Sequence, residues 1–232
     1  MKIMSFNTQH CANYVTKRID YPIMAKAIKT CFADIVGLNE MRDKGEREDF
    51  EAQTAELARL TGLEHYYFAK AIEWRGSNPY GNGLLSRYPI ISAETIMVPD
   101  PAEKKYSGHY ETRCLLKARL ACGITVLVIH FGLNPDEQKN AVDTVLEHLE
   151  EERCVLMGDF NVTPDNDILA PIRVRMKDTA DAFDGQLLSF PSDEPIMKID
   201  YIFVSPDIEV GEADIPAIVA SDHRPHTVEI EF

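Results

Sequence analysis

The chain is organised around one stretch, Val155-Leu156-Met157-Gly158-Asp159-Phe160-Asn161-Val162-Thr163-Pro164. The apolar run from Cys154 to Met157 predicts a buried strand of the kind found inside an α/β sandwich, and Gly158 is expected to end it. Residues two apart in extended chain point to the same side, so Asp159 and Asn161 should face the solvent end of the sheet while Phe160 points into the core. A carboxylate that takes a proton or binds a cation, beside an amide that orients water, is suited to activating water.

The length and composition of the chain bound what it can be. Its 232 residues suit one domain over 1–232, with ample chain for a sizeable core. Hydrophobic residues make up 45% and charged residues 27%, which is ordinary for a soluble globular protein. Lys and Arg number 24 against 38 Asp and Glu, and the net charge of −14 disfavours non-specific binding to nucleic acid. A phosphate substrate stays compatible with this charge where a metal ion inverts the local field.

Cysteine usage and hydropathy bear on the compartment. Five cysteines are present and no two form a C-x-x-C motif, which favours small buried hydrophobes in a reduced setting over disulfides. No long apolar segment follows Met1 to Asn7, and no stretch approaches the ~18 apolar residues of a membrane span. We therefore expect a cytoplasmic protein without a membrane span. The sequence leaves the oligomeric state open.

Periodicity predicts many strands with helices at intervals. Helices are expected over 19–32, from the polar segment 44–49 to Thr61 with Gly62 as its stop, from Pro135 to about Glu151 with Asn134 as N-cap, and over 165–176. Strands are expected over 2–6, 34–38, 66–72, 82–86, 90–98, 113–121, 124–130, 154–157, 198–204 and 227–232. Because these elements do not alternate strictly, they favour an α/β fold with two packed sheets and helices outside.

Several polar residues share a placement at or beside an apolar, strand-like run. They are Asn7, Glu40, His130, Asp159, Asn161, Asp200, Asp222 and His223. Any one of them alone is an ordinary cap or turn residue. Together they offer oxygen ligands for a hard cation, two imidazoles and an amide that orients water. Because no Cys or His spacing resembles a zinc site, Mg²⁺ or Mn²⁺ is the expected ion.

In these blocks the chain resembles the endonuclease/exonuclease/phosphatase family, the deoxyribonuclease-I-like superfamily. The most specific blocks are Gly158-Asp159-Phe160-Asn161 and Ser221-Asp222-His223-Arg224-Pro225. The others, in the family's order, are Met4-Ser5-Phe6-Asn7, Gly37-Leu38-Asn39-Glu40, Gly83-Leu84-Leu85-Ser86-Arg87-Tyr88-Pro89-Ile90, Glu111-Thr112-Arg113, His130-Phe131 and Ile199-Asp200-Tyr201-Ile202. The chain departs from the family at Asn39, where Gln is usual, and it has few basic loops of the kind that nucleases carry.

The resemblance implies a fold and a reaction. The fold would be a four-layer α/β/β/α sandwich, with two mixed sheets packed face to face. The activity would be Mg²⁺-dependent hydrolysis of a phosphate ester, with Mn²⁺ as the alternative ion. Glu40 would bind the ion, helped by Asn7 and Asp222. Asp159 would deprotonate or position the attacking water, and Asn161 would hold water or phosphate in line.

The remaining roles also follow from the resemblance. His130 and His223 would donate hydrogen bonds to phosphoryl oxygens or protonate the leaving group. We expect Asp200 to pair with His130 and Asp222 to pair with His223, because a neighbouring carboxylate keeps an imidazole protonated. The substrate would be contacted by Arg113, which forms an E-x-R motif with Glu111, and by side chains at the cleft, namely Tyr80 and Asn82, with Arg75 and Lys198 as further candidates. His10, His65, His109, His148 and His226 have no motif and are interpreted as surface or packing residues.

We predict a phosphoesterase acting on a small or non-polymeric phosphate mono- or diester. The alternatives are a nuclease or abasic-site DNA repair enzyme, which a basic strip beside the site would indicate, and hydrolysis of sphingomyelin or inositol phosphates, which an apolar membrane-docking hairpin would favour. From a different class, an inactive binding module of the same fold would show the loss of a metal ligand or a catalytic histidine. The loops that choose a substrate vary freely, so the sequence does not name it.

Overall fold

The stretch before Asp159 forms an inner strand, β8 (Cys154–Asp159). The computed structural model describes residues 1–183 and 187–232 of the chain. β8 pairs in parallel with β7 (Thr125–His130) and antiparallel with β10 (Asp200–Val204). Since both edges and both faces of β8 are covered, all of its residues are buried, as its continuous apolar pattern predicts.

Two mixed six-stranded sheets are present in the described part of the chain. One has the order β5-β6-β7-β8-β10-β9 and adds β5 (Ile90–Met97), β6 (Cys114–Leu120) and β9 (Lys177–Asp178) to the three strands above. The other has the order β11-β12-β1-β2-β4-β3 and is built from β11 (Glu209–Asp214), β12 (His226–Glu231), β1 (Lys2–Asn7), β2 (Ile35–Arg42), β4 (Pro79–Ser86) and β3 (His65–Glu73).

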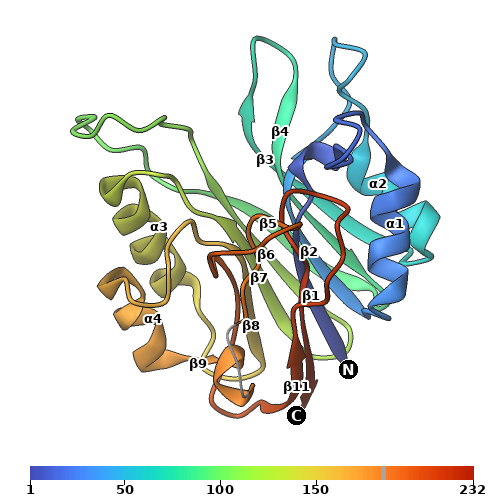
Figure 1. Ribbon diagram of the computed structural model, residues 1–232. Helices are drawn as coiled ribbons and strands as arrows, with labels where there is room; N and C mark the ends of the chain where they lie inside the picture. Colours follow the sequence, from blue (N-terminus) through green and yellow to red (C-terminus); the bar gives the residue numbers. More distant parts are fainter. Residues whose placement is uncertain (184–186) are drawn as a thin grey trace.

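Helices cover the outer face of each sheet (Figure 1). α1 (Tyr21–Thr30) and α2 (Gln53–Thr61) pack on the sheet that contains β1 and β2. α3 (Pro135–His148) and α4 (Ala170–Arg175) pack on the sheet that contains β7 and β8. Short 3₁₀ turns lie at η1 (Gln9–Cys11), η2 (Asp167–Leu169) and η3 (Thr179–Ala182). The predicted four-layer α/β/β/α sandwich is therefore confirmed.

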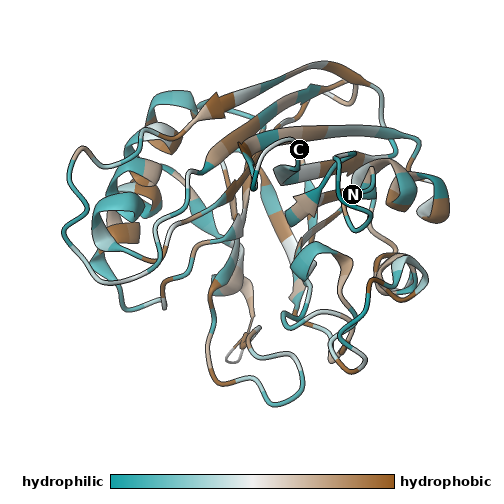
Figure 2. Ribbon diagram, turned by 90° about the horizontal axis from the view of Figure 1, so that it is seen from above, coloured by the Kyte–Doolittle hydropathy of each residue, from teal (hydrophilic) through white to brown (hydrophobic). Residues whose placement is uncertain are grey.

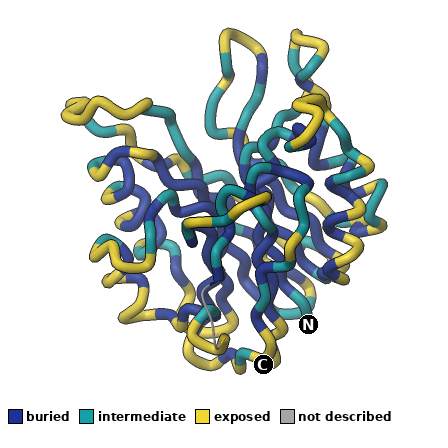
Figure 3. The backbone as a smooth tube through the Cα atoms, in the orientation of Figure 1, coloured by how far each residue is buried: buried dark blue, intermediate teal, exposed yellow. Residues whose placement is uncertain are grey.

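The space between the sheets is filled by alternate residues of facing strands. Ile3, Ile35 and Val228 from one sheet meet Val128 and Met157 from the other in a single apolar cluster. Figure 2 shows hydrophobic residues concentrated on the strands, and Figure 3 shows that exposed positions lie on loops and on the outer sides of the helices. Burial of this apolar surface from both sheets is the main stabilising contribution to such a sandwich.

Helix ends follow their sequence signals. Asn134 precedes α3 as predicted, and Glu137 Oε2 accepts from the Asn134 backbone N–H at 3.2 Å in a capping box. Gly62 ends α2 in the left-handed conformation with φ 80°, which glycine adopts without strain. α1 begins at Tyr21, two residues after the predicted start, because Asp20 caps it by accepting from the Ile23 backbone N–H.

The structure differs from the predicted elements in several places. α2 begins at Gln53, so the polar segment 44–49 precedes the helix and does not start it. β2 extends to Arg42 and β4 begins at Pro79, both beyond their predicted ends. β8 runs through Gly158 and ends at Asp159, since Gly158 lies so close to β7 that a Cβ there would stand 1.7 Å from the Ile129 carbonyl oxygen. β9 and β11 were not predicted, because both are edge strands whose short or polar sequences lack a hydrophobic alternation. In the described residues, no helix has the length and apolar character that crossing a membrane requires.

The ends of several strands meet at one rim of the sandwich. Asn7 at the end of β1 is level with Asn39 of β2, and His130 at the end of β7 is level with Asp159 of β8. The Asn39 side chain joins the two sheets at this rim. Its Oδ1 accepts from the Asp159 backbone N–H at 2.9 Å, and its Nδ2 donates to the Ile129 carbonyl oxygen at 2.9 Å. The distance between the two sheets is thus set by hydrogen bonds directly beneath the polar residues.

Candidate active site

A cavity of about 630 Å³ opens at this rim. Its polar lining includes Glu40, Asp159, His130, His223 and Asn161. The cavity is also lined by Tyr80, Glu111, Arg113, Gln138, Thr163, Asn166 and the apolar Leu133, Pro135, Val162, Phe190, Met197 and Ile199. The polar residues quoted from distant parts of the sequence therefore meet in one place.

Asn7 links the two carboxylates at the base of the cavity. Its Nδ2 donates to Glu40 Oε1 at 3.1 Å and to Asp159 Oδ2 at 3.0 Å. Glu40 lies where the pairing of β2 shifts register, with φ 61°, and this irregularity turns its side chain toward the rim. Burial by itself would raise the pKa of Glu40, but His10, Asn7 and the His223 charge together hold it below its usual value. Glu40 is thus an ionised carboxylate, which is the donor that a hard cation prefers.

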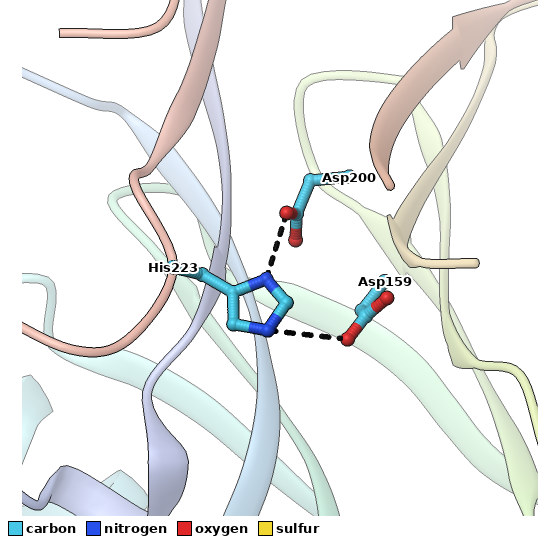
Figure 4. A group of neighbouring side chains, drawn as sticks. All are labelled: Asp159, Asp200 and His223. Carbon is cyan, nitrogen blue, oxygen red and sulfur yellow. Dashed lines mark hydrogen bonds and ion pairs between the residues drawn. The ribbon is translucent and has the colours of Figure 1, made fainter. Parts of the chain in front are cut away.

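His223 lies between two buried aspartates (Figure 4). Its Nδ1 donates to Asp200 Oδ2 at 2.8 Å, and its Nε2 is 3.6 Å from Asp159 Oδ2. Burial opposes a charged imidazole, but the charges of Asp200 and Asp159 outweigh it and raise the pKa of His223. The ring is therefore an imidazolium at neutral pH, and its Nε2–H points toward the cavity side of Asp159.

Asp159 has the environment of a general base. Its side chain is 2% exposed, and burial raises its pKa above the usual carboxylate value, with the Asp200 charge acting in the same direction and His223 opposing both. Its Oδ1 accepts from the Asn161 backbone N–H at 2.9 Å. A carboxylate of raised pKa accepts a proton more readily than an exposed one does.

His130 is in the opposite charge state. Burial, followed by the neighbouring Arg113 guanidinium, lowers the pKa of His130 well below its ordinary value. Its Nδ1 lies 3.2 Å from Arg113 Nη1, and its Nε2 lies 3.5 Å from Asp159 Oδ2. Arg113 Nη1 can only donate, so Nδ1 accepts from it, while the Asn161 Nδ2 amide lies 3.2 Å from Nε2. Both imidazoles therefore place Nε2 near the same carboxylate oxygen.

The predicted pairing of the histidines with the aspartates is wrong. Asp200 pairs with His223, not with His130. Asp222 accepts from Gln9 Nε2 at 2.7 Å and from Ser221 Oγ at 3.0 Å, and it does not bind His223. The reason is strand order, since β10 carries Asp200 on the side of β8 away from β7 and its His130. Asp222 nevertheless lies close enough to Glu40 for the Glu40 charge to contribute to raising its pKa, after burial.

The water-orienting pair at 159 and 161 is arranged largely as the sequence predicts. Asp159 and Asn161 both line the cavity, and Phe160 is buried against Phe131 and Tyr201. Asn161 adopts φ 50°, and its Nδ2 donates to the Phe131 carbonyl oxygen at 3.0 Å. The same Nδ2 lies 3.2 Å from His130 Nε2, so the amide is held between Phe131 and His130.

The predicted substrate residues divide into two groups. Arg113 and Tyr80 line the cavity, and Arg113 is held by an ion pair with Glu111. Asn82 is buried behind it, where its Nδ2 donates to the Cys114 carbonyl oxygen at 2.9 Å and its Oδ1 accepts from Asn39. Arg75 stacks on the Trp74 ring, and Lys198 lies 3.7 Å from Asp178 Oδ2. Asn82 and Lys198 are therefore structural, because their polar atoms face buried neighbours.

Three residues of the site region were not assigned a role from the sequence. His10 Nδ1 lies 3.9 Å from Glu40 Oε2, Gln9 binds Asp222, and Asn39 joins the sheets. His10 follows Asn7 by three residues, and that proximity to a motif is the signal that could have identified it. Asn39 was noted only as a departure from the family pattern.

Two sets of residues could hold a metal ion. Asp159, Asp200 and His223 have ligand atoms within 4.8 Å of one another. Glu40, with Asn7 and Asp222 nearby, forms the other set. We favour the set around Glu40. His223 carries a proton on Nδ1, which it donates to Asp200, and an imidazolium has no free nitrogen lone pair with which to ligate a metal. Glu40 and Asp222 offer carboxylate oxygens, the donors that Mg²⁺ or Mn²⁺ prefers. Asn7 turns its Nδ2 toward Glu40, and its Oδ1 accepts from the Gln9 backbone N–H at 3.1 Å.

Comparisons with known proteins identify the family and the fold. The sequence profile described as "Endonuclease/Exonuclease/phosphatase family" matches residues 4–223. An Escherichia coli K12 protein named "Uncharacterized protein YbhP" is 25% identical over 252 residues, covering 100% of this chain and 96% of that protein. The crystal structure of an endonuclease/exonuclease/phosphatase from Beutenbergia cavernae superimposes with a TM-score of 0.79 at 22% identity, covering 100% of this chain and 71% of that one. The mannosyl-6-phosphatase Bt3783 of Bacteroides thetaiotaomicron superimposes with a TM-score of 0.76 at 17% identity, with both chains covered fully (100% and 100%).

Proposed function

Because the chain belongs to the endonuclease/exonuclease/phosphatase family, whose members are typically hydrolases of phosphate esters, we propose that it is a metal-dependent phosphoesterase for a small, non-polymeric substrate. One observation carries this proposal. Asp159 Oδ2 is surrounded by Asn7 Nδ2 at 3.0 Å, His130 Nε2 at 3.5 Å and His223 Nε2 at 3.6 Å. A proton acceptor, an amide donor and two imidazoles thus converge at one wall of a cavity, which suits attack of water on a phosphoryl group.

Glu40, with Asn7 and Asp222, would hold Mg²⁺ or Mn²⁺. When bound, such an ion polarises a phosphoryl oxygen and stabilises the charge that develops on it. The acidic surroundings of the site require a cation of this kind before a phosphate can approach. The family membership and the ionised carboxylate of Glu40 support this assignment.

The protein side chains divide the reaction between them. Asp159 takes a proton from the attacking water while the oxygen of that water bonds to phosphorus. Asn161 orients the water in line with the leaving oxygen. His223 and His130 donate hydrogen bonds to phosphoryl oxygens through Nε2. As the ester P–O bond breaks, the leaving alkoxide takes a proton, and the His223 imidazolium is the donor whose charge suits that step.

The cavity supports a small substrate. Its volume of about 630 Å³ falls within the range of small-molecule sites, roughly 300–1,000 Å³. Among the described residues that line it, Arg113 is the sole Lys or Arg, and Glu111 already pairs with it. Such a site offers few positive charges to bind the successive phosphate groups of a nucleic acid. The apolar wall, which includes Phe190 and Met197, suits an uncharged alcohol portion of the substrate. One structural relative is named a mannosyl-6-phosphatase, and that name describes a small phosphate ester as its substrate.

The proposal is tested by a substrate screen with and without metal. The purified protein is incubated with Mg²⁺, with Mn²⁺ or with a chelator, and offered small sugar and aryl phosphomonoesters, a chromogenic phosphodiester, plasmid DNA and phospholipid vesicles. We expect turnover of a small ester that needs the metal and is lost in Asp159→Asn. Turnover confined to plasmid DNA would establish the nuclease alternative instead. No turnover of any substrate, in a protein that still binds phosphate, would favour the inactive binding module.

A further inference from the structure

Three fully buried polar side chains below the cavity lack hydrogen-bond partners. Within the described residues, no partner is found for Ser5 Oγ, Asp200 Oδ1, or either ring nitrogen of His226. All three side chains belong to residues that are 0% exposed. A buried polar atom without a partner is costly, so a group of them in one place indicates a specific role.

The strand register places these side chains between the two sheets. Ser5 of β1 is paired with His226 of β12, two residues from the pair formed by Ile3 and Val228, whose side chains lie in the inter-sheet core. Asp200 of β10 is likewise two residues from Ile202, which lies in the same core. Since side chains alternate along a strand, Ser5, His226 and Asp200 all face the space between the sheets.

Contacts across the sandwich bring the three together. β10 packs against both β1 and β12, and the His226 ring lies against the backbone of Asp200. Asp200 uses Oδ2 to accept from His223 Nδ1, while Oδ1 points away from that bond. The second oxygen of the aspartate that orients His223 thus has no protein partner and lies on the same inter-sheet face as Ser5 and His226.

We propose that His226 is a positioning residue, which together with Ser5 holds Asp200 Oδ1 through an internal water molecule and so keeps Asp200 Oδ2 aimed at His223 Nδ1. Internal water is the usual partner for buried polar atoms that protein groups do not satisfy. Partners of this kind beyond an active-site group fix its orientation. The proposed series of hydrogen bonds then runs from His226 and Ser5 through the water and Asp200 to His223, whose Nε2 faces Asp159.

The chemistry of the neutral ring supports this arrangement. Burial, aided by the Lys198 charge, lowers the pKa of His226 to about 3, so the ring carries one proton. The ring can donate a hydrogen bond from one nitrogen and accept a hydrogen bond from a hydroxyl group at the other. A water molecule that accepts a hydrogen bond from the imidazole N–H can in turn donate one to the Asp200 carboxylate. An apolar residue at position 226 would fill the space and remove both functions.

The test compares His226→Leu with His226→Gln and with a matched control. Leu removes the polar atoms, while Gln keeps a donor and an acceptor. Ile230→Val is the control, since Ile230 lies on β12 in the same inter-sheet core and has no polar side chain. The first readout is the downfield proton resonance of His223 Nδ1–H in metal-free, substrate-free protein, assigned by its loss in His223→Gln. We expect this resonance to shift or broaden in His226→Leu, to be restored in His226→Gln, and to stay unchanged in Ile230→Val.

The second readout rests on the proposed function. With a small phosphate ester, kcat should fall roughly tenfold in His226→Leu with KM little changed, and it should recover in His226→Gln. If His226→Leu does not fold, Ser5→Ala replaces it, and the same change in the resonance is expected. A resonance that is identical in wild type, His226→Leu and Ser5→Ala would overturn the inference, as would equal loss of kcat in His226→Leu and Ile230→Val. If the protein hydrolyses no phosphate ester, the proposed function fails alone, because the resonance still decides this inference.

Discussion

At the scale of single residues, the environment sets the charge of each group in the site. His223 and His130 are both buried and both lie within 3.6 Å of Asp159 Oδ2, yet their pKa values move in opposite directions. His223 has a carboxylate on its other nitrogen and His130 has a guanidinium. Histidine is therefore a cation on one side of Asp159 and a neutral ring on the other.

The role of Glu40 as a metal ligand is checked by Glu40→Gln. The substitution keeps the size and removes the charge, so the metal concentration needed for half-maximal activity should rise by roughly tenfold or more, because a hard cation binds a carboxylate better than an amide. Titration of activity with Mg²⁺ and with Mn²⁺ measures the effect. Glu111→Gln is the control, since Glu111 lines the same cavity and is bonded to Arg113. An unchanged metal requirement in Glu40→Gln would place the ion elsewhere.

His226 should make the fold sensitive to acid. Its pKa is lowered from 6.5 to about 3 by burial and by the Lys198 charge, so below pH 6.5 the unfolded chain binds a proton that the folded chain excludes. Stability from this group is present above pH 6.5 and is lost as the pH falls toward 3. Relative to His226→Leu, the wild type should lose about 2 kcal/mol of unfolding free energy between pH 6.5 and pH 5. Urea unfolding at several pH values checks this, and parallel curves for the two proteins would contradict it.

At the scale of elements, the contact between β7 and β8 decides where the site lies. Their parallel pairing puts His130 level with Asp159 and brings Gly158 against Ile129. The β2 irregularity between Leu38 and Met41 acts in the same way for Glu40 in the other sheet. Each strand end carries its polar side chain to the rim because the strand beside it fixes its register.

Gly158→Ala should disrupt this contact. A Cβ at this position would stand 1.7 Å from the Ile129 carbonyl oxygen, and φ is 150°, so both packing and backbone conformation oppose it. We expect a loss of more than about 4 kcal/mol in unfolding free energy, because the obstructing atom belongs to a buried backbone. Gly211→Ala is the control, since the nearest atom there is 3.3 Å away in an edge strand. Similar melting temperatures for the two variants would show that β7 can move.

At the scale of the whole molecule, charge favours the proposed small substrate over duplex DNA. The net charge is −14, and the described residues lining the cavity include one Lys or Arg, Arg113. Few Lys or Arg side chains can replace the counterions of duplex DNA, so the release of counterions should contribute little to binding by this protein. The sandwich instead provides an open, partly apolar cavity at the rim, lined by residues from both sheets.

Binding to duplex DNA should accordingly be weak. We expect a Kd weaker than roughly 10⁻⁴ M for a random duplex at physiological salt, with little change as the salt concentration is lowered. Fluorescence anisotropy of a labelled duplex in the presence of Mg²⁺ and Asp159→Asn protein measures this without cleavage. Micromolar binding that strengthens steeply at low salt would contradict it and would support the nuclease alternative.

Local sequence pattern was sufficient for the elements and for the members of the site. Apolar runs ending in polar residues placed Asn7, Glu40, His130 and Asp159 at strand ends. The residues of a buried strand change from apolar to polar where the strand leaves the core and reaches solvent. The order of the blocks then identified the family, and with it the four-layer fold. These features depend on residues close together in the chain, so the sequence by itself determined them.

Only the tertiary structure decided which of these residues touch. The pairing of Asp200 with His223, the join that Asn39 makes between the sheets, and the buried position of His226 all depend on strand order and register. Asn82 was predicted at the cleft and lies behind it for the same reason, since its side chain faces Cys114 of the opposite sheet. Contacts between residues far apart in the chain follow from how two sheets pack face to face, and a local pattern carries no information about that facing.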